Sequence, residues 1–416
     1  MRRVVITGYG CITPAGIGPE LLWRSITTGK SHIEPIKRFD ATAYASQIAG
    51  QIDDFTVTDF IPRRLVKKTD RFTHLALASV KMAIENAKLN LKKTNPERVG
   101  VMVGNVLGGW EFAERELRNL WAKGEKNISP YQATAWFSAA PQGNITIQFG
   151  IKGKARTFIS DRASGAFALT GGAEAIRMNQ ADVVLAGGTE APLSPYGWLC
   201  CQTSGYLTKS NSEPHSVYRP FDSQHSGSVI GEGSSFVVLE EFNHAVKRGA
   251  YILAEITGWS ATNDAYYPYY TMRPDGKGLS KSILKSLEKS EITPEKLSYI
   301  AAHGSAIPAE DGTEIYGIRE ALGERAASIP ISAPKASIGH LMGAAAPTDL
   351  IMTLEGIKNN TLPPTANLEI PAIGFEDLNL VCKEENQDMQ DSHCMVLSRG
   401  MGGTNVSIIL SSSVEA

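Results

Sequence analysis

The sequence predicts an α/β fold in which helices cover both faces of buried sheets. Short apolar runs rich in Val and Ile alternate with segments of helical periodicity along the whole chain, and continuous apolar strands are typical of sheets covered on both sides. The alternation starts again near residue 250, so the chain contains two successive rounds of strands and helices. We therefore expect two halves, residues 1–250 and residues 251–416, packed as one compact unit.

The individual elements follow from the hydrophobic runs and their spacing. In the first round, strands are predicted at residues 3–7, 99–103, 157–159, 181–187 and 234–239, and helices at residues 20–28, 73–91 and 163–178. In the second round, strands are predicted at residues 252–258 and 300–303, and helices at residues 278–287 and 311–322. Residues 394–397 and 405–410 flank a glycine-rich turn and are predicted to close the chain as a pair of strands.

The composition argues against several classes of function. Lys and Arg number 41 against 43 acidic residues, so the charge balance indicates neither a nucleic-acid footprint nor a polybasic membrane patch. The start MRRVVITGYG leads directly into a strand, and no apolar run approaches the roughly 20 residues that span a bilayer. The five cysteines lack metal-ligand spacing. We expect a cytoplasmic protein with reduced thiols that binds no metal, nucleic acid or membrane.

The most informative stretch is the turn from the strand at residues 157–159 into the helix at residues 163–178. Ser160 and Asp161 stand between the two elements, and both are good helix N-caps. Enzymes use such a corner to hold a nucleophile, because the positive end of the helix dipole lowers the pKa of a thiol. The residue at this corner is Arg162, whose protonated guanidinium cannot attack a substrate. A cation here is disfavoured by up to about 1 kcal/mol, so we expect an anionic or carbonyl partner, with Asp161 the nearest candidate.

Three further clusters contain residues that can carry chemistry. One histidine follows an apolar strand, a lysine and a second histidine flank a helix start rich in small residues, and a glycine-rich turn lies near the C-terminus. In chain order the candidates are His303, Lys335, His340, Gly400, Met401 and Gly402. Glycines in such a turn let backbone N–H groups approach a ligand oxygen. Taken singly, each cluster is weak, because a lone histidine is more often a hydrogen-bonded structural residue and glycine loops are usually only turns.

Taken together, the clusters carry a resemblance. From residue 2 to residue 411 the chain resembles the β-ketoacyl-acyl-carrier-protein synthases of the thiolase fold. Those enzymes have a Cys in T-A-C-x-S-G, a His in H-G-T-x-T, a Lys and a His in K-x-x-x-G-H, and a G-F-G-G-T-N loop. The corresponding residues here are Arg162, His303, Lys335 and His340, followed by residues 400–405. The resemblance implies a thiolase-like fold with a duplicated, layered α-β-α-β-α motif.

The departures from the family pattern bear on activity. In the family, the Cys takes the acyl chain and the two His decarboxylate the malonyl extender, so Arg162 implies a synthase without condensation chemistry of its own. Ser305 keeps a hydroxyl for a phosphopantetheine arm, whereas Ile307 has lost one, and Met401 replaces the family's gating Phe. Arg162 either plugs the vestigial pocket through a salt bridge or holds an acyl or carboxylate group there. We favour the plug.

Two longer stretches resemble one subfamily, the chain length factors, which are the nucleophile-free partner subunits of bacterial type II polyketide synthases. Residues 108–124, GGWEFAERELRNLWAKG, resemble the signature G-G-F-E-F-x-x-R-E-L-x-N-L-W-x-K-G, and residues 194–198, SPYGW, resemble the segment C/S-P-Y-G-W. In chain length factors these positions line the far end of a tunnel that crosses the subunit interface. The resemblance therefore assigns control of chain length to Trp110, Ala113, Leu117 and Trp198.

Helical spacing places Trp110, Ala113, Leu117 and Trp121 on one helix face. Without the resemblance, this stripe indicates an amphipathic helix that packs into the core. For Trp121 we keep that interpretation and expect it to be buried in the core.

The predicted function is that of a non-acylating chain length factor that heterodimerises with a catalytic ketosynthase. The pair builds a poly-β-ketone from malonyl units on the phosphopantetheine of an acyl carrier protein, toward an aromatic polyketide precursor of intermediate length. This subunit binds no cofactor itself. One alternative is a free-standing, homodimeric malonyl-carrier decarboxylase, which the retained His303 and His340 keep open because many chain length factors have lost both. Another is a scaffold without a pocket.

Overall fold

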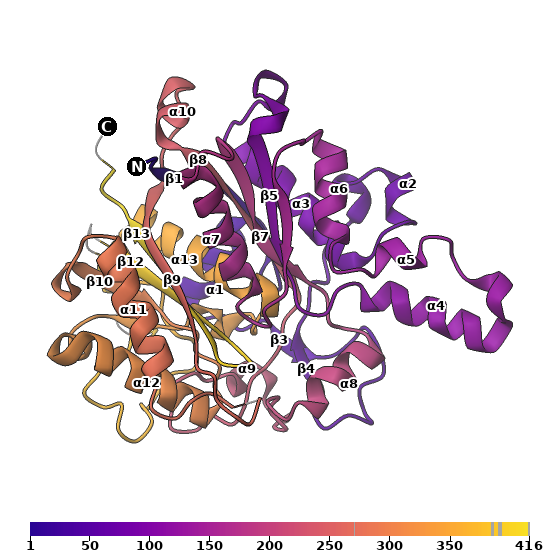
Figure 1. The fold of residues 1–416 in the computed structure, drawn as a ribbon. Helices are drawn as coiled ribbons and strands as arrows, with labels where there is room; N and C mark the ends of the chain where they lie inside the picture. Colours follow the sequence, from indigo (N-terminus) through magenta and orange to yellow (C-terminus); the bar gives the residue numbers. More distant parts are fainter. Residues whose placement is uncertain (270, 384–386, 390–392, 415–416) are drawn as a thin grey trace.

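The computed structural model describes residues 1–269, 271–383, 387–389 and 393–414. One mixed sheet dominates the structure, with the strand order β11-β10-β12-β13-β9-β1-β8-β7-β5-β6 (Figure 1). Its N-terminal strands are β1 (Val4–Thr13), β5 (Val99–Gly104), β6 (Ala155–Phe158), β7 (Val183–Glu190) and β8 (Gly233–Glu241). Its C-terminal strands are β9 (Ala254–Asn263), β10 (Leu297–Ala301), β11 (Ile331–Ser332), β12 (His393–Gly400) and β13 (Thr404–Ser411). The short β2 (Gly16–Ile17) pairs with β1, and β3 (Ile33–Pro35) pairs with β4 (Ile48–Gly50).

The two halves of this sheet repeat one another. In the N-terminal half, β1 is antiparallel to β8, β8 is antiparallel to β7, and β7, β5 and β6 are parallel. In the C-terminal half, β9, β13, β12, β10 and β11 follow in the same order with the same directions. The halves join where β1 pairs with β9. This repetition confirms the predicted duplication.

Helices cover both halves and separate them. The helices are α1 (Pro19–Thr28), α2 (Arg63–Val66), α3 (Arg71–Asn86), α4 (Trp110–Lys123), α5 (Gln132–Ala135), α6 (Ala140–Phe149), α7 (Ser164–Arg177), α8 (Pro195–Thr203), α9 (Pro214–Val217), α10 (Phe242–Lys247), α11 (Lys277–Lys289), α12 (Pro308–Leu322) and α13 (Ala345–Asn359). Short 3-10 turns are η1 (Val57–Asp59), η2 (Leu91–Lys93), η3 (Pro96–Arg98), η4 (Glu125–Asn127), η5 (Pro294–Lys296), η6 (Gly323–Ala327), η7 (Pro334–Ser337) and η8 (Met342–Ala344).

The hydrophobic cores reveal the layers. The central core joins α7 and α13 to strands of both halves. A second core packs α3 and α6 onto the N-terminal strands, and a third packs α11 and α12 onto the C-terminal strands. The order of layers is therefore helix, half-sheet, helix, half-sheet, helix, which is the layered arrangement expected from the sequence.

Three local predictions are wrong. Residues 157–159 were expected to form a buried strand, but β6 lies at the edge of the sheet and Ile159 is 61% exposed. Trp121 was expected in the core, but it is 77% exposed, because α4 projects away from the sheet beyond its first turns (Figure 1). Ser160 and Asp161 do not cap the following helix, because α7 starts later, after Ala163, with no side-chain cap.

Two features are absent from the described residues. None of their helices combines the length and apolar character needed to cross a membrane. Within the same residues, no group of three or more His, Cys, Asp and Glu side chains is arranged to hold a metal ion.

Candidate functional site

The site is built around the corner between β6 and α7. Asp161 has a positive φ of 48°, which turns the chain sharply after the strand and directs the next side chain inward. That next residue is Arg162, and it is only 1% exposed. The corner therefore has the shape expected of a nucleophile-bearing turn, and it presents a guanidinium to the interior.

Arg162 is held by a carboxylate from the other half of the chain. Its Nη1 and Nη2 donate to Oε2 and Oε1 of Glu310, each over 2.9 Å, so the pair is bidentate. The predicted partner, Asp161, also contacts Arg162, but over a longer 3.3 Å from Nε to Oδ2. The ring centroid of Tyr206 lies 5.6 Å from the guanidinium carbon, within range of a cation–π contact. The corner is thus filled by an ion pair, as the plug interpretation requires.

The charges of this pair stabilise one another. Burial lowers the pKa of the Arg162 guanidinium, but the charges of Glu310 and Asp161 outweigh it, so that this pKa lies above its usual value. Burial raises the pKa of the Glu310 carboxyl, but the Arg162 charge reverses the shift, so that this pKa lies below its usual value. Both groups are therefore charged at neutral pH, and each makes the burial of the other tolerable.

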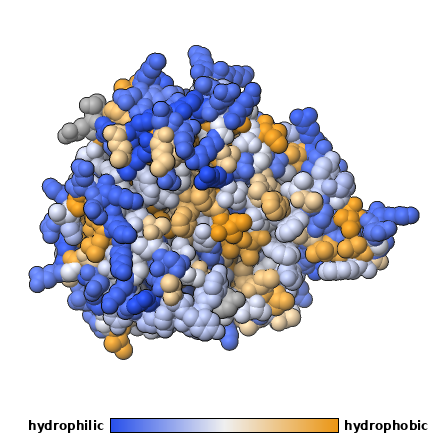
Figure 2. Space-filling view, viewed as in Figure 1, coloured by the Kyte–Doolittle hydropathy of each residue, from blue (hydrophilic) through white to orange (hydrophobic). Residues whose placement is uncertain are grey.

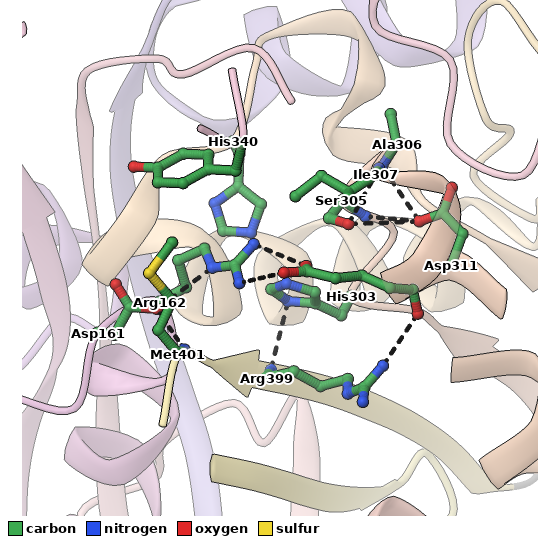
Figure 3. A network of polar contacts seen from close by, with 12 residues as sticks. Asp161, Arg162, His303, Ser305, Ala306, Ile307, Asp311, His340, Arg399 and Met401 are labelled. Carbon is green, nitrogen blue, oxygen red and sulfur yellow. Dashed lines mark hydrogen bonds and ion pairs between the residues drawn. The ribbon is translucent and has the colours of Figure 1, made fainter. Parts of the chain in front are cut away.

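The two predicted histidines lie beside Arg162 (Figure 3). Their ring centroids are 4.9 Å apart. Nδ1 of His303 accepts the backbone N–H of Arg399 over 3.3 Å, and Nδ1 of His340 accepts that of Met342 over 3.1 Å. A ring nitrogen that accepts such a bond carries no proton, so each neutral ring carries its proton on Nε2. Among the described residues, neither Nε2 has a hydrogen-bond partner.

Burial, followed by the neighbouring cations, keeps these rings neutral. Burial is the largest influence and lowers the pKa of both histidines well below the usual value. The neighbouring Arg162 and Lys335 charges lower the pKa of each ring further. This buried cluster therefore offers two neutral N–H donors and one guanidinium, a set that attracts an anion, and Glu310 already supplies one.

The loop that carries His303 is fastened by the first turns of α12. The Glu314 carboxylate accepts the backbone N–H groups of His303 and Gly304, over 2.7 and 2.9 Å. Lys335 lies on the other side of the loop and donates to the carbonyl oxygens of Ala302 and His303, over 2.6 and 2.8 Å, and it pairs with Asp349 at 2.9 Å. Lys335 is thus a structural clamp on the histidine loop.

The remaining candidates near the corner are occupied by internal contacts. The turn of Gly400, Met401 and Gly402 joins β12 to β13, and the Met401 N–H donates to Oδ2 of Asp161 over 2.7 Å. Ser305 is fully buried, and its hydroxyl oxygen accepts the backbone N–H of Ile307 over 3.2 Å. The predicted ligand-facing groups of both segments therefore bind protein atoms.

The predicted chain-length residues lie at the start of α4 and in α8. Ala113 and Trp198 are buried, whereas Trp110 and Leu117 are half-buried. The Trp198 indole donates to the carbonyl oxygen of Ser46 over 2.8 Å. Trp198 also belongs to the same hydrophobic core as Tyr206, which contacts Arg162, so one continuous cluster extends from the corner to α8.

Sequence reasoning missed three residues of the site. Glu310 is 148 positions from Arg162 along the chain, and an acidic residue in the first turn of a helix is ordinarily a dipole partner. Arg399 is 1% exposed, and its Nη1 donates to the Glu310 carbonyl oxygen and to Thr313. Tyr196 has its ring centroid 4.6 Å from that of Trp110. The available signals were the segment SPYGW, which contains Tyr196, and the glycine-rich turn, which Arg399 directly precedes.

The chain matches known proteins over its whole length. Residues 1–245 match the family described as Beta-ketoacyl synthase, N-terminal domain, and residues 253–369 match Beta-ketoacyl synthase, C-terminal domain. The 3-oxoacyl-[acyl-carrier-protein] synthase 2 of Coxiella burnetii is 36% identical over 99% of this chain and 98% of its own. The tetracenomycin polyketide synthase ketoacyl synthase beta subunit of Streptomyces glaucescens is 34% identical over 98% of both chains.

Two solved structures share the fold. The ishigamide ketosynthase/chain length factor matches with a TM-score of 0.91 and 27% identity, over 99% of this chain and 100% of its own. The AntDE:AntF structure, a type II PKS acyl-carrier protein in complex with its ketosynthase bound to the hexaketide, matches with a TM-score of 0.90 and 27% identity over the same shares. These matches confirm the thiolase-like fold. The chain belongs to the beta-ketoacyl synthase family.

Proposed function

We propose that this protein is a chain length factor: a non-acylating subunit that pairs with a catalytic ketosynthase. The pair builds a poly-β-ketone from malonyl units carried on the phosphopantetheine of an acyl carrier protein, and the product is the precursor of an aromatic polyketide. The partner supplies the nucleophilic Cys. This chain shapes the far end of the tunnel and needs no cofactor of its own.

The observation that carries this proposal is the buried ion pair of Arg162 and Glu310. It stands at the position that matches the family's nucleophilic Cys, and both oxygens of Glu310 bind the guanidinium. A thioester carbonyl needs a nucleophile at this corner, and a protonated guanidinium has no lone pair to offer. This chain therefore does not form an acyl-enzyme at this corner, and the proposed role of the fold is a different one.

An exposed apolar surface supports the proposed partner. Hydrophobic residues gather near the centre of the face in Figure 2 and on its projecting arm. Around β6 and along α4 to α6, the most exposed are Ile147 (82%), Trp121 (77%), Ile159 (61%) and Phe137 (55%). Large exposed apolar side chains are enriched at surfaces that another protein covers. The ketoacyl synthase beta subunit and the ketosynthase/chain length factor among the relatives are named as parts of such assemblies.

The start of α4 supports the proposed control of chain length. Trp110 is half-buried at the first position of the helix, next to the small, buried Ala113 one turn later. A growing chain that reaches this end meets the indole ring, while Ala113 leaves room beside it. One large side chain decides between chain lengths, because a two-carbon unit is small compared with an indole.

The test is a reconstitution with a ketosynthase that retains the Cys, a carrier protein and malonyl-CoA, read out as product mass. We expect product only when both subunits are present, and a product longer by at least one two-carbon unit with Trp110→Ala. Tyr251→Ala, at a residue 80% exposed, is the matched aromatic control and leaves the length unchanged. Product of the same length from the ketosynthase without this chain contradicts the proposal.

One observation favours a second candidate, a malonyl-carrier decarboxylase. The Nε2–H groups of His303 and His340 are buried beside Arg162 without a partner among the described residues. Two such donors can stabilise the enolate left when a malonyl group loses carbon dioxide. Carbon dioxide released from malonyl-carrier by this chain alone selects this candidate.

A further inference from the structure

We propose that Tyr196 is a further chain-length-determining residue, which holds the Trp110 ring in place from behind. This inference rests on the proposed function and goes beyond it, because it names a residue outside the set that the resemblance assigns. Tyr196 lies in the first turn of α8, next to the start of α4.

Trp110 packs against two aromatic rings. The Tyr196 ring centroid lies 4.6 Å from that of Trp110, with 47° between the ring planes. The Trp136 ring centroid lies 6.4 Å from it, also at 47°. Both arrangements are within the range of favourable aromatic pairs. The indole is therefore fixed by its neighbours, and the space at this end depends on all three rings.

The backbone of Tyr196 is tied to α4. Its backbone N–H donates to Oε2 of Glu114 on α4 over 3.0 Å, which ties the first turn of α8 to the second turn of α4. The backbone that carries the phenol ring is therefore fixed against α4.

The backbone of α8 approaches Trp110 closely. A Cβ atom built on Gly197 would lie 3.6 Å from the Trp110 Cβ, so the first turn of α8 lies directly against this side chain. The Tyr196 ring, from the same turn of α8, packs against the indole. If it is removed, the indole can rotate away from the tunnel toward α8.

The placement of Tyr196 separates this role from a purely structural one. Tyr196 is 47% exposed, and substitutions of such surface residues usually change the free energy of unfolding by less than about 0.5 kcal/mol. A change at this position therefore leaves the fold intact and acts on the position of Trp110. The expected effect is on the length of the product, with its total amount changed less than twofold.

The experiment compares Tyr196→Ala, Tyr196→Phe and Leu199→Ala in the reconstituted pair, with product mass and total product both measured. Leu199 is the matched control, because it is 43% exposed on the same helix and one turn closer to the C-terminus. We expect Tyr196→Ala to lengthen the product by at least one two-carbon unit. Tyr196→Phe keeps the aromatic ring at this position, and Leu199→Ala leaves the three rings of Trp110, Trp136 and Tyr196 unchanged. Both variants are therefore expected to give a product of wild-type length.

Each other outcome overturns the inference. If Trp110→Ala lengthens the product and Tyr196→Ala only reduces its amount, Tyr196 is structural, and the proposed function stands. If Leu199→Ala lengthens the product as much as Tyr196→Ala does, the effect comes from any change in α8 and Tyr196 has no specific role. If the wild-type pair yields no polyketide, the proposed function fails and this inference fails with it.

Discussion

The ion pair of Arg162 and Glu310 makes a strong prediction about stability. We consider the substitutions Arg162→Met and Glu310→Leu, singly and together, because Met and Leu replace the charged side chains with apolar ones of similar size. The side chains are 1% and 6% exposed, so removing Arg162 leaves the buried Glu310 carboxylate without its ion-pair partner, and removing Glu310 leaves Arg162 with only the longer contact to Asp161. Breaking a buried pair in this way costs about 3–5 kcal/mol, whereas replacing both partners is often neutral or stabilising.

We therefore expect each single substitution to lower the free energy of unfolding by about 3–5 kcal/mol, and the double substitution to lower it by less than either one. Because the Glu310 carboxyl titrates, the free energy of unfolding also depends on pH. In the wild type its pKa is lowered, so its contribution is fully present above the unfolded pKa of about 4.3 and is lost as the pH falls through the folded pKa. In Arg162→Met, burial without a cation raises that pKa, so the destabilisation grows as the pH rises.

The assay is urea unfolding of the four proteins at pH 5 and pH 8. Arg162→Met is expected to lose more stability at pH 8 than at pH 5, and the wild-type contribution of Glu310 to be flat over this range. Single substitutions that cost less than about 1 kcal/mol, or costs that simply add in the double variant, refute the reasoning. In that case Arg162 is not locked by Glu310.

Two further predictions concern the partner surface and the histidines. Trp121→Ser is expected to leave the stability of the isolated chain within about 0.5 kcal/mol, because the side chain is 77% exposed, yet to weaken association with the ketosynthase in a pull-down. The control Tyr251→Ser changes a residue that is 80% exposed and is expected to leave association unchanged. If both variants bind the ketosynthase equally well, Trp121 does not lie in the interface. His303→Ala is expected to leave polyketide formation by the pair unchanged, because the proposed function gives the residues around Arg162 no part in acyl transfer. Loss of product with an intact heterodimer assigns the histidine a chemical role.

Much of the fold was accessible from the sequence because strands buried on both faces leave continuous apolar runs. The runs at residues 3–7, 99–103 and 234–239 coincide with β1, β5 and β8, apart from Arg3, which precedes β1. The repeat of this pattern after residue 250 indicated the duplication, which the matching order of the two half-sheets confirms. Boundaries were less accurate, because a strand such as β1 continues through glycines and polar residues to Thr13.

The sequence was less informative where an element meets solvent or a distant segment. Periodicity placed Trp121 on the apolar stripe of α4, but it does not show that the helix leaves the body of the protein before that residue. The need of Arg162 for an anion followed from charge alone. That Glu310 is the main anion followed only from the fold, which brings the start of α12 against the corner after β6.

The most direct test of the account is to find where the acyl chain is attached. The reconstituted pair is incubated with malonyl-loaded carrier protein, quenched with acid, and each subunit is weighed as an intact protein by mass spectrometry. The account predicts an acyl adduct on the ketosynthase and an unchanged mass for this chain, because Arg162 cannot form a thioester. A covalent acyl adduct on this chain would contradict it.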